Sequence, residues 1–136
     1  MISRLKSALN IPIFILALGI TSLSFTAYQA QVSEQNETSR RAAFEMLKSL
    51  NHLQMLIDKE YYGHVNKERF IQGWSDILLI DDMAVFTSKQ VRQHSEGLLA
   101  LWKRSFENLD NKEVNTQLSQ HIKKTRDVLK KSVLAL

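Results

Sequence analysis

An uncharged, largely apolar stretch near the N-terminus constrains this chain more than any other feature. Residues 7–33 carry no formal charge, and their centre, residues 11–28, consists mostly of Ile, Leu, Phe and Ala. A helix of about 20 apolar residues spans the roughly 30 Å hydrocarbon layer of a bilayer. Arg4 and Lys6 precede the stretch and the next charge is Glu34, which favours a cytoplasmic N-terminus. We therefore expect residues 1–32 to form a cytoplasmic N-terminus and a single-pass anchor in the cell inner membrane, with the remaining chain in the periplasm.

A cleaved signal peptide is the alternative for the same residues, because a basic start, an apolar core and small polar residues follow one another. Signal-peptide cleavage requires a small residue three positions before the cleavage site. Cleavage after either nearby alanine would put Phe25 or Tyr28 there, whereas a cut after Ser24 would put Ser22 there. This alternative predicts a soluble periplasmic protein.

The rest of the sequence favours helices throughout. The single proline is Pro12, and only three glycines interrupt the chain after it, at positions 63, 73 and 97. Residues 33–42 are nearly all polar and predict a stalk, whereas residues 43–136 carry apolar residues at spacings of three and four. Cysteine is absent, which excludes disulfides and thiolate metal sites. The prediction is an all-α protein: a transmembrane helix, a stalk and an up-down four-helix bundle.

Local signals divide the bundle into four segments. The first helix runs to Tyr61, and Asn66 is expected to cap a second helix over residues 67–86. Thr87 begins a third helix as the first residue of a capping box, and Asp110 begins a fourth that continues almost to Leu136. Connections this short predict that successive helices are antiparallel neighbours.

The apolar pattern of the second helix is too broad to face a single neighbour, so we expect this helix to be the most buried of the four. Counting from the turn at Phe86 places Trp102 of the third helix opposite Gly73 of the second. The missing side chain of Gly73 would admit the indole. The tryptophans and glycines are therefore interpreted as packing residues.

Charge and histidine placement argue against several functions. The chain has a net charge of +4, but its basic excess lies at the two ends, with no groove-reading or stacking element, so nucleic-acid binding is not expected. His94 and His121 flank the third and fourth helices without any metal-binding spacing. We expect no metal, no cofactor and no catalytic residue.

Two groups of residues are candidates for binding a protein partner. Tyr62 and His64 lie beside the first turn, where an exposed tyrosine is a common interface anchor, although both can also cap the bundle end. Asp81 and Asp82 lie near the end of the second helix, level with Arg92 of the third. The acidic pair either forms a cross-turn salt bridge with Arg92 or receives a cation from a partner.

The C-terminal segment is basic and then apolar, a combination typical of contact with anionic lipid headgroups. The alternative is a helix that solvates its outer face with lysines. The residues concerned are Lys123, Lys124, Arg126, Lys130, Lys131, Leu134 and Leu136.

The function predicted from these features is that of a non-enzymatic, membrane-anchored accessory protein of the bacterial envelope, whose bundle surface holds a protein partner near the membrane. The general architecture is similar to the sensory bundles of bacterial chemoreceptors, which favours an alternative: a ligand-binding or sensory bundle acting through a separate membrane partner. An apolar internal pocket would favour the alternative, and a filled core with an exposed apolar patch would favour the interaction protein.

Overall fold

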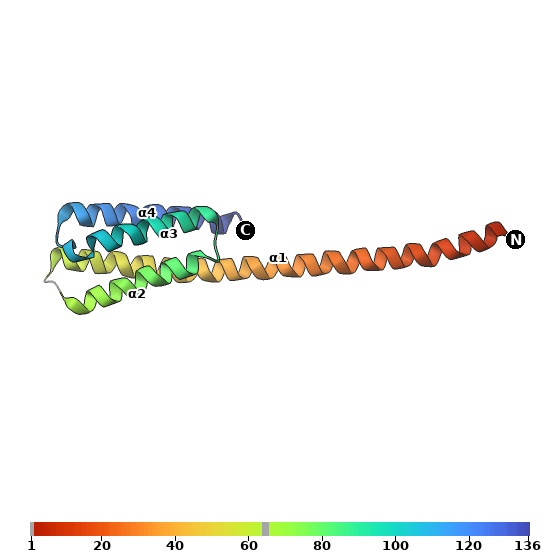
Figure 1. Ribbon diagram of the computed structural model, residues 1–136, viewed down its shortest axis with the longest axis horizontal. Helices are drawn as coiled ribbons and strands as arrows, with labels where there is room; N and C mark the ends of the chain where they lie inside the picture. Colours follow the sequence, from red (N-terminus) through yellow and green to blue (C-terminus); the bar gives the residue numbers. More distant parts are fainter. Residues whose placement is uncertain (1, 64–65) are drawn as a thin grey trace. The chain divides into compact units, whose positions relative to one another are not determined.

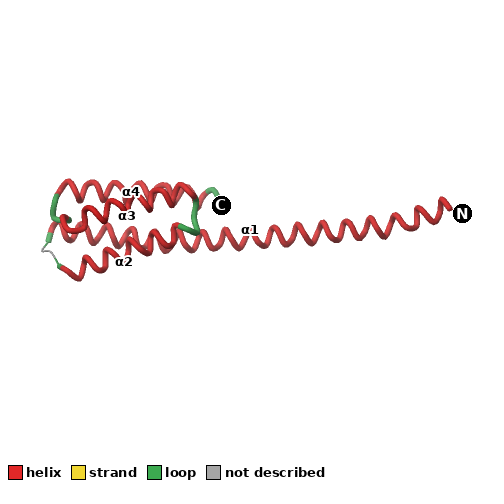
Figure 2. Tube along the Cα trace, viewed as in Figure 1, coloured by secondary structure: helices red, strands yellow, loops and turns green. Residues whose placement is uncertain are grey.

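The computed structural model describes the backbone of residues 2–63 and 66–136, and the side chains of residues 10–63 and 66–136. Four α-helices account for most of this chain: α1 (Ile2–Tyr62), α2 (Lys67–Ala84), α3 (Lys89–Ser105) and α4 (Lys112–Leu134). A single 3₁₀ turn, η1 (Phe106–Asn108), follows α3 (Figure 1). The described residues contain helices and loops but no strand, as Figure 2 shows. The prediction of an all-helical chain is confirmed.

The chain divides into two compact units, one ending at Glu37 and the other comprising Thr38–Leu136. In the first unit α1 continues through Pro12 and presents exposed apolar side chains from Ile11 to Tyr28. By length and composition this part of α1 could cross a membrane, and a signal sequence would pass the same test. The hydroxyls of Thr21, Ser24 and Thr26 donate to the carbonyl four residues earlier, so these polar groups are satisfied inside the helix.

The second unit is an arrangement of four helices in which the last part of α1 and α2, α3 and α4 run alternately up and down (Figure 1). Each helix contributes an apolar stripe to one shared core, as the periodic spacing predicts. Fully buried core side chains come from all four helices: Met46, Leu50, Leu53, Ile57, Ile77, Ile80, Val91, Leu98, Trp102, Leu118, Ile122 and Leu129.

The largest buried side chain, Trp102 of α3, packs directly over Gly73 of α2. A Cβ atom on Gly73 would overlap the indole atoms Cζ2 and Cη2, so the close approach of α2 and α3 depends on glycine here. Trp74 and Phe106 pack against the indole, with ring centroids 6.3 Å and 6.4 Å from that of Trp102. The predicted pairing of Trp102 with Gly73 is confirmed.

The helix caps agree with the sequence only in part. Asn66 caps α2 by accepting a hydrogen bond from the Glu68 backbone N–H, as predicted. The prediction that Thr87 caps α3 is wrong: Ser88 is the cap and accepts from the Val91 N–H at 3.3 Å. The Thr87 hydroxyl instead donates backward to the Ala84 carbonyl at 2.7 Å.

The predicted cap of α4 is displaced in the same way. Asp110 was expected to begin this helix, but the cap is Asn111. The Asn111 side-chain oxygen accepts from the N–H groups of Glu113 at 2.8 Å and Val114 at 3.2 Å. In both turns two adjacent residues can cap, and the two that do, Ser88 and Asn111, have the extended backbone angles of an N-cap residue.

The expectation that α2 is the most buried helix is also wrong. Four residues of α2 are buried, whereas α3 buries six within a shorter helix. The buried residues of α2, which include Gly73 and Ile77, form one stripe, and a second apolar stripe lies on the opposite side of the helix in solvent. The apolar pattern was broad because α2 has two apolar faces, only one of which packs in the bundle.

Candidate interaction surfaces

The second apolar face of α2 is the most unusual surface of the bundle. We call it the α2 outer face and define it as Ile71, Leu78, Leu79 and Val85. Ile71, Leu78 and Val85 are 72%, 50% and 63% exposed and follow one another at intervals of seven residues, which places them on one side of the helix. In the part of the chain that the structure describes, α3 exposes no large apolar side chain, and α4 exposes only Leu134. A soluble bundle would ordinarily place polar residues where α2 has this stripe.

The charged residues predicted at the end of α2 do not form the expected bridge. Asp81 is half-buried and accepts a hydrogen bond from the Ser95 hydroxyl of α3 at 3.4 Å. Asp82 and Arg92 are both exposed, and within the described residues no ion pair joins them. The reason is geometric: Asp81 faces α3, and the next residue along a helix points about 100° away. Asp82 therefore lies on the same side of α2 as the outer face, between Leu78 and Leu79 around the helix.

Tyr62 is exposed, as the sequence suggested, and is the most exposed aromatic side chain of the bundle at 84%. Its ring meets that of Tyr61 edge to face, with centroids 4.7 Å apart. It also borders a shallow, open groove between α1 and α4, together with Met55 and Arg126. His64 lies outside the described residues.

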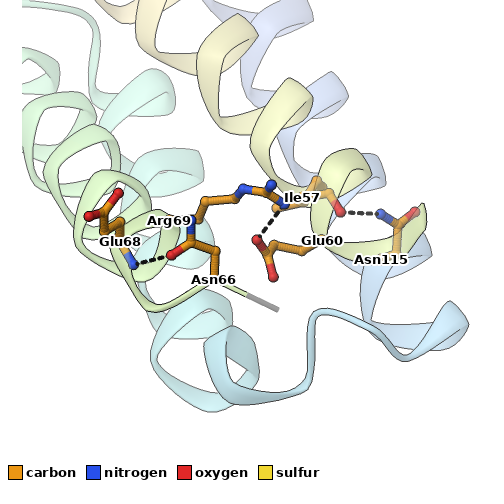
Figure 3. A network of polar contacts seen from close by, with 6 residues as sticks. All are labelled: Ile57, Glu60, Asn66, Glu68, Arg69 and Asn115. Atoms are coloured by element: carbon orange, nitrogen blue, oxygen red, sulfur yellow. Dashed lines mark hydrogen bonds and ion pairs between the residues drawn. The ribbon is translucent and has the colours of Figure 1, made fainter. Parts of the chain in front are cut away.

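A polar network at the same end of the bundle was not predicted (Figure 3). The carboxylate of Glu60 in α1 is fully buried and accepts from the Arg69 guanidinium of α2 at 2.9 Å. The Asn115 side chain of α4 donates to the Ile57 carbonyl of α1 at 3.3 Å. A buried carboxylate is costly unless it is paired, so the Glu60–Arg69 pair fixes how α1 and α2 meet. We assign this network a structural role.

The basic residues of the C-terminal segment do not form a single surface. Lys123 is paired with Asp127 at 2.8 Å on the same helix. Arg126 is half-buried and donates to the Asn51 side chain of α1 at 2.5 Å. Lys124 lies close enough to His121 to act on its charge. Lys130 and Lys131 are exposed near the end of the helix.

The end of α4 meets the turn between α2 and α3. Leu134 is 88% exposed and Leu136 is 41% exposed. Leu136 lines a small hollow of about 230 Å³ together with Ser39 of α1 and Thr87 and Ser88 of the turn. The start of the second unit, the α2–α3 turn and the C-terminus therefore lie at one end of the bundle.

The histidines are placed in two different environments. His52 of α1 and Asp76 of α2 form a 2.5 Å contact between Nδ1 and Oδ2. Burial raises the pKa of Asp76, and the hydrogen bond and charge of His52 partly oppose that rise. Burial lowers the pKa of His121, assisted by the positive charges of Lys124, His94 and Arg104. Among the residues with described side chains, no three His, Asp or Glu groups are placed to hold a metal ion.

Comparison with known proteins gives no match. No family model fits the chain, and no curated protein sequence and no solved structure is significantly similar to it. The surfaces of the bundle are therefore the features that bear on its function.

Proposed function

We propose that this protein is a non-enzymatic, membrane-anchored interaction protein of the bacterial envelope, whose bundle holds a protein partner close to the membrane through the α2 outer face. The observation that carries the proposal is the exposed stripe of Ile71, Leu78 and Val85. Fully burying one such side chain stabilises a complex by about 1.5–3 kcal/mol relative to leaving it in water. Covering the whole stripe would supply a substantial driving force for association.

The spacing of the stripe favours a helical partner. Apolar residues that recur every seven positions along one helix match the same repeat on another helix, which packs against it with interlocking side chains. Leu79 widens the apolar stripe, and the exposed carboxylate of Asp82 lies among these side chains, between Leu78 and Leu79 around the helix. The partner we propose is therefore an amphipathic helix with an apolar face of matching repeat and a basic residue positioned to meet Asp82.

The first unit supports attachment to the membrane. An apolar helix segment that is preceded by Arg4 and Lys6, and in which the hydroxyls of Thr21, Ser24 and Thr26 bond to the helix backbone, is suited to the hydrocarbon layer. We propose a cytoplasmic N-terminus, an inner-membrane span and a periplasmic bundle. If residues before Phe25 were removed instead, the same bundle would be soluble in the periplasm.

The filled core supports an interaction protein over the ligand-binding alternative. Trp102 occupies the space above Gly73, and the surrounding aromatic rings pack against it within 6.4 Å. The groove beside Tyr62 is shallow and open, with charged residues among its lining. Small-molecule sites are typically enclosed and mostly apolar.

Site-specific photocrosslinking tests the proposal. A photoreactive amino acid replaces Leu78 in the full-length protein, expressed in the cells that normally make it, and a matched position, Glu96 on the polar face of α3, serves as the control. We expect a discrete adduct with a second protein from position 78 and none from position 96. Adding Ile71→Ser and Val85→Ser should remove the adduct while leaving the helical circular dichroism unchanged.

Two results would contradict the proposal. Identical adducts from positions 78 and 96 would mean that the crosslinks report general proximity. An adduct of position 78 with a second copy of this chain would mean that the α2 outer face closes a homodimer and is not available to another protein.

A further inference from the structure

One end of the bundle combines exposed apolar side chains with unpaired basic ones. Phe86, in the α2–α3 turn, is 50% exposed, and Leu134, at the end of α4, is 88% exposed. These residues come from distant parts of the sequence, but Thr87 and Leu136 line the same hollow, so the turn and the C-terminus lie side by side. We call this surface the basal end and define it as Arg40, Phe86, Lys89, Lys130, Lys131, Leu134 and Leu136.

Four basic side chains share the basal end with the apolar ones. Arg40, Lys89, Lys130 and Lys131 are all exposed, and no ion pair with them occurs in the described part of the chain. The negative charges at this end include Asp127, which lies near Lys130 and Lys131 but is paired with Lys123, together with the exposed Asp82 and the C-terminal carboxylate. Four basic side chains outnumber them, so positive charge predominates.

Lys89 is the most informative of these residues. It lies in the first turn of α3, where the helix dipole disfavours positive charge, and that turn contains no acidic residue. At this position the positive charge of Lys89 is not stabilised by its own helix. An anion outside the protein would stabilise it.

We infer that the basal end rests on an anionic bilayer surface, with lipid phosphates meeting Lys89, Lys130 and Lys131 and with Phe86 and Leu134 entering the headgroup–acyl boundary. The inference rests on the membrane anchor in the proposed function. Basic residues around a short apolar tip are the combination that binds such surfaces. In an anchored chain the connection to this end is short, because Ser39 follows Tyr28 by only 11 residues (39 − 28) in the sequence.

The structure changes which residues belong to this surface. Lys123 and Arg126 already have partners in the bundle, in Asp127 and Asn51 respectively. Lys124 is part of the positive cluster around His121. Phe86 and Lys89, which are distant from the C-terminus in sequence, join Lys130 and Lys131 instead.

The absence of cysteine allows the inference to be tested with single labels. Full-length Leu134→Cys is labelled with a nitrobenzoxadiazole fluorophore and reconstituted in nanodiscs of phosphatidylcholine, with or without phosphatidylglycerol. The matched control is Tyr62→Cys, because Tyr62 is similarly exposed, 84% against 88% for Leu134, at the opposite end of the bundle. Iodide quenching then reports exposure to water, and nitroxide lipids report contact with the bilayer.

The inference predicts that the label at position 134 is shielded from iodide and quenched by nitroxide lipid only in discs that contain phosphatidylglycerol. High salt should reverse the shielding, because it screens the attraction. The double substitution of Lys130→Glu and Lys131→Glu should lower the equilibrium constant for docking of the bundle on the bilayer at least about tenfold. The same charge change at the other end, Lys103→Glu with Arg104→Glu, should have no such effect, and the label at position 62 should remain accessible throughout.

Several outcomes would overturn the inference. Shielding at position 134 that is unaffected by lipid charge and salt would exclude recognition of anionic headgroups. Shielding that disappears in discs holding one copy would show that the basal end contacts protein. Equal accessibility at positions 62 and 134 in every disc would show that the end is solvated. Co-elution of the protein with the disc tests the membrane anchor, and crosslinking at position 78 tests the α2 outer face. The docking of the basal end can therefore fail while either of these two proposals holds.

Discussion

Replacing Gly73 by alanine sets two opposing effects against each other in the core. In an ordinary helix interior, alanine is more stable than glycine by about 0.5–1 kcal/mol. At this position, however, the added methyl group would overlap Cζ2 and Cη2 of Trp102. Overpacking of a core costs about 1–3 kcal/mol, and the rigid, fully buried indole places this site near the upper limit. We therefore expect Gly73→Ala to lower the free energy of unfolding by about 2 kcal/mol.

Gly97→Ala provides the matched control. Gly97 also lies within a helix, α3, but a Cβ atom there would meet no atom within 4 Å. Only the helix preference remains, so the substitution should raise the free energy of unfolding by about 0.5–1 kcal/mol. The two glycines should thus respond to the same change with opposite signs.

Urea unfolding of the full-length protein in mild detergent measures both effects. Tryptophan fluorescence reports on the bundle alone, because both tryptophans, Trp74 and Trp102, lie there. In a Trp102→Leu background the penalty of Gly73→Ala should largely disappear, and Trp74 remains as the reporter. If Gly73→Ala stabilised the protein as much as Gly97→Ala does, the proposed packing of α2 on α3 would be refuted.

Two further predictions concern local features. Asn111→Ala should cost about 1 kcal/mol of stability, whereas Asp110→Ala should cost much less, because Asn111 supplies the cap of α4; equal losses in urea unfolding would contradict that assignment. His121 should make stability depend on pH. Its pKa is lowered in the folded protein, so the unfolded chain binds more protons below the usual value of 6.5 and stability declines as the pH falls from there. Urea unfolding from pH 5 to 8 should show a weaker decline in stability for His121→Gln than for the wild-type protein. Identical pH profiles for the variant and the wild type would exclude a contribution of His121.

The helices and the Gly73–Trp102 contact could be predicted because they depend on local information. Apolar spacing defines each helix, and short turns fix which residues of neighbouring helices lie level. The caps at Ser88 and Asn111 were missed by one residue. Both turns offer two adjacent capping side chains, and the choice depends on backbone angles that composition does not specify.

The α2 outer face and the basal end were harder to predict for different reasons. Ile71, Leu78 and Val85 gave a clear sequence signal, a second apolar repeat opposite the core, but periodicity alone does not show which stripe has a neighbour. The antiparallel order of the helices predicts that the α2–α3 turn and the end of α4 lie at the same end of the bundle, and both line one hollow there. Which side chains are exposed at that end depends on tertiary packing and has no local signal. The Glu60–Arg69 pair was missed for the same reason, since neither residue lies in a recognisable motif.

The mass of the mature protein in a fractionated membrane preparation tests most directly whether the intact chain is retained in the membrane. We expect the full 15.7 kDa chain in the pellet after an alkaline carbonate wash, which removes peripheral proteins but leaves spanning helices in place. A shorter chain beginning at Phe25 and recovered in the soluble fraction would contradict the anchor, and with it the proposal that the bundle holds its partner at the membrane.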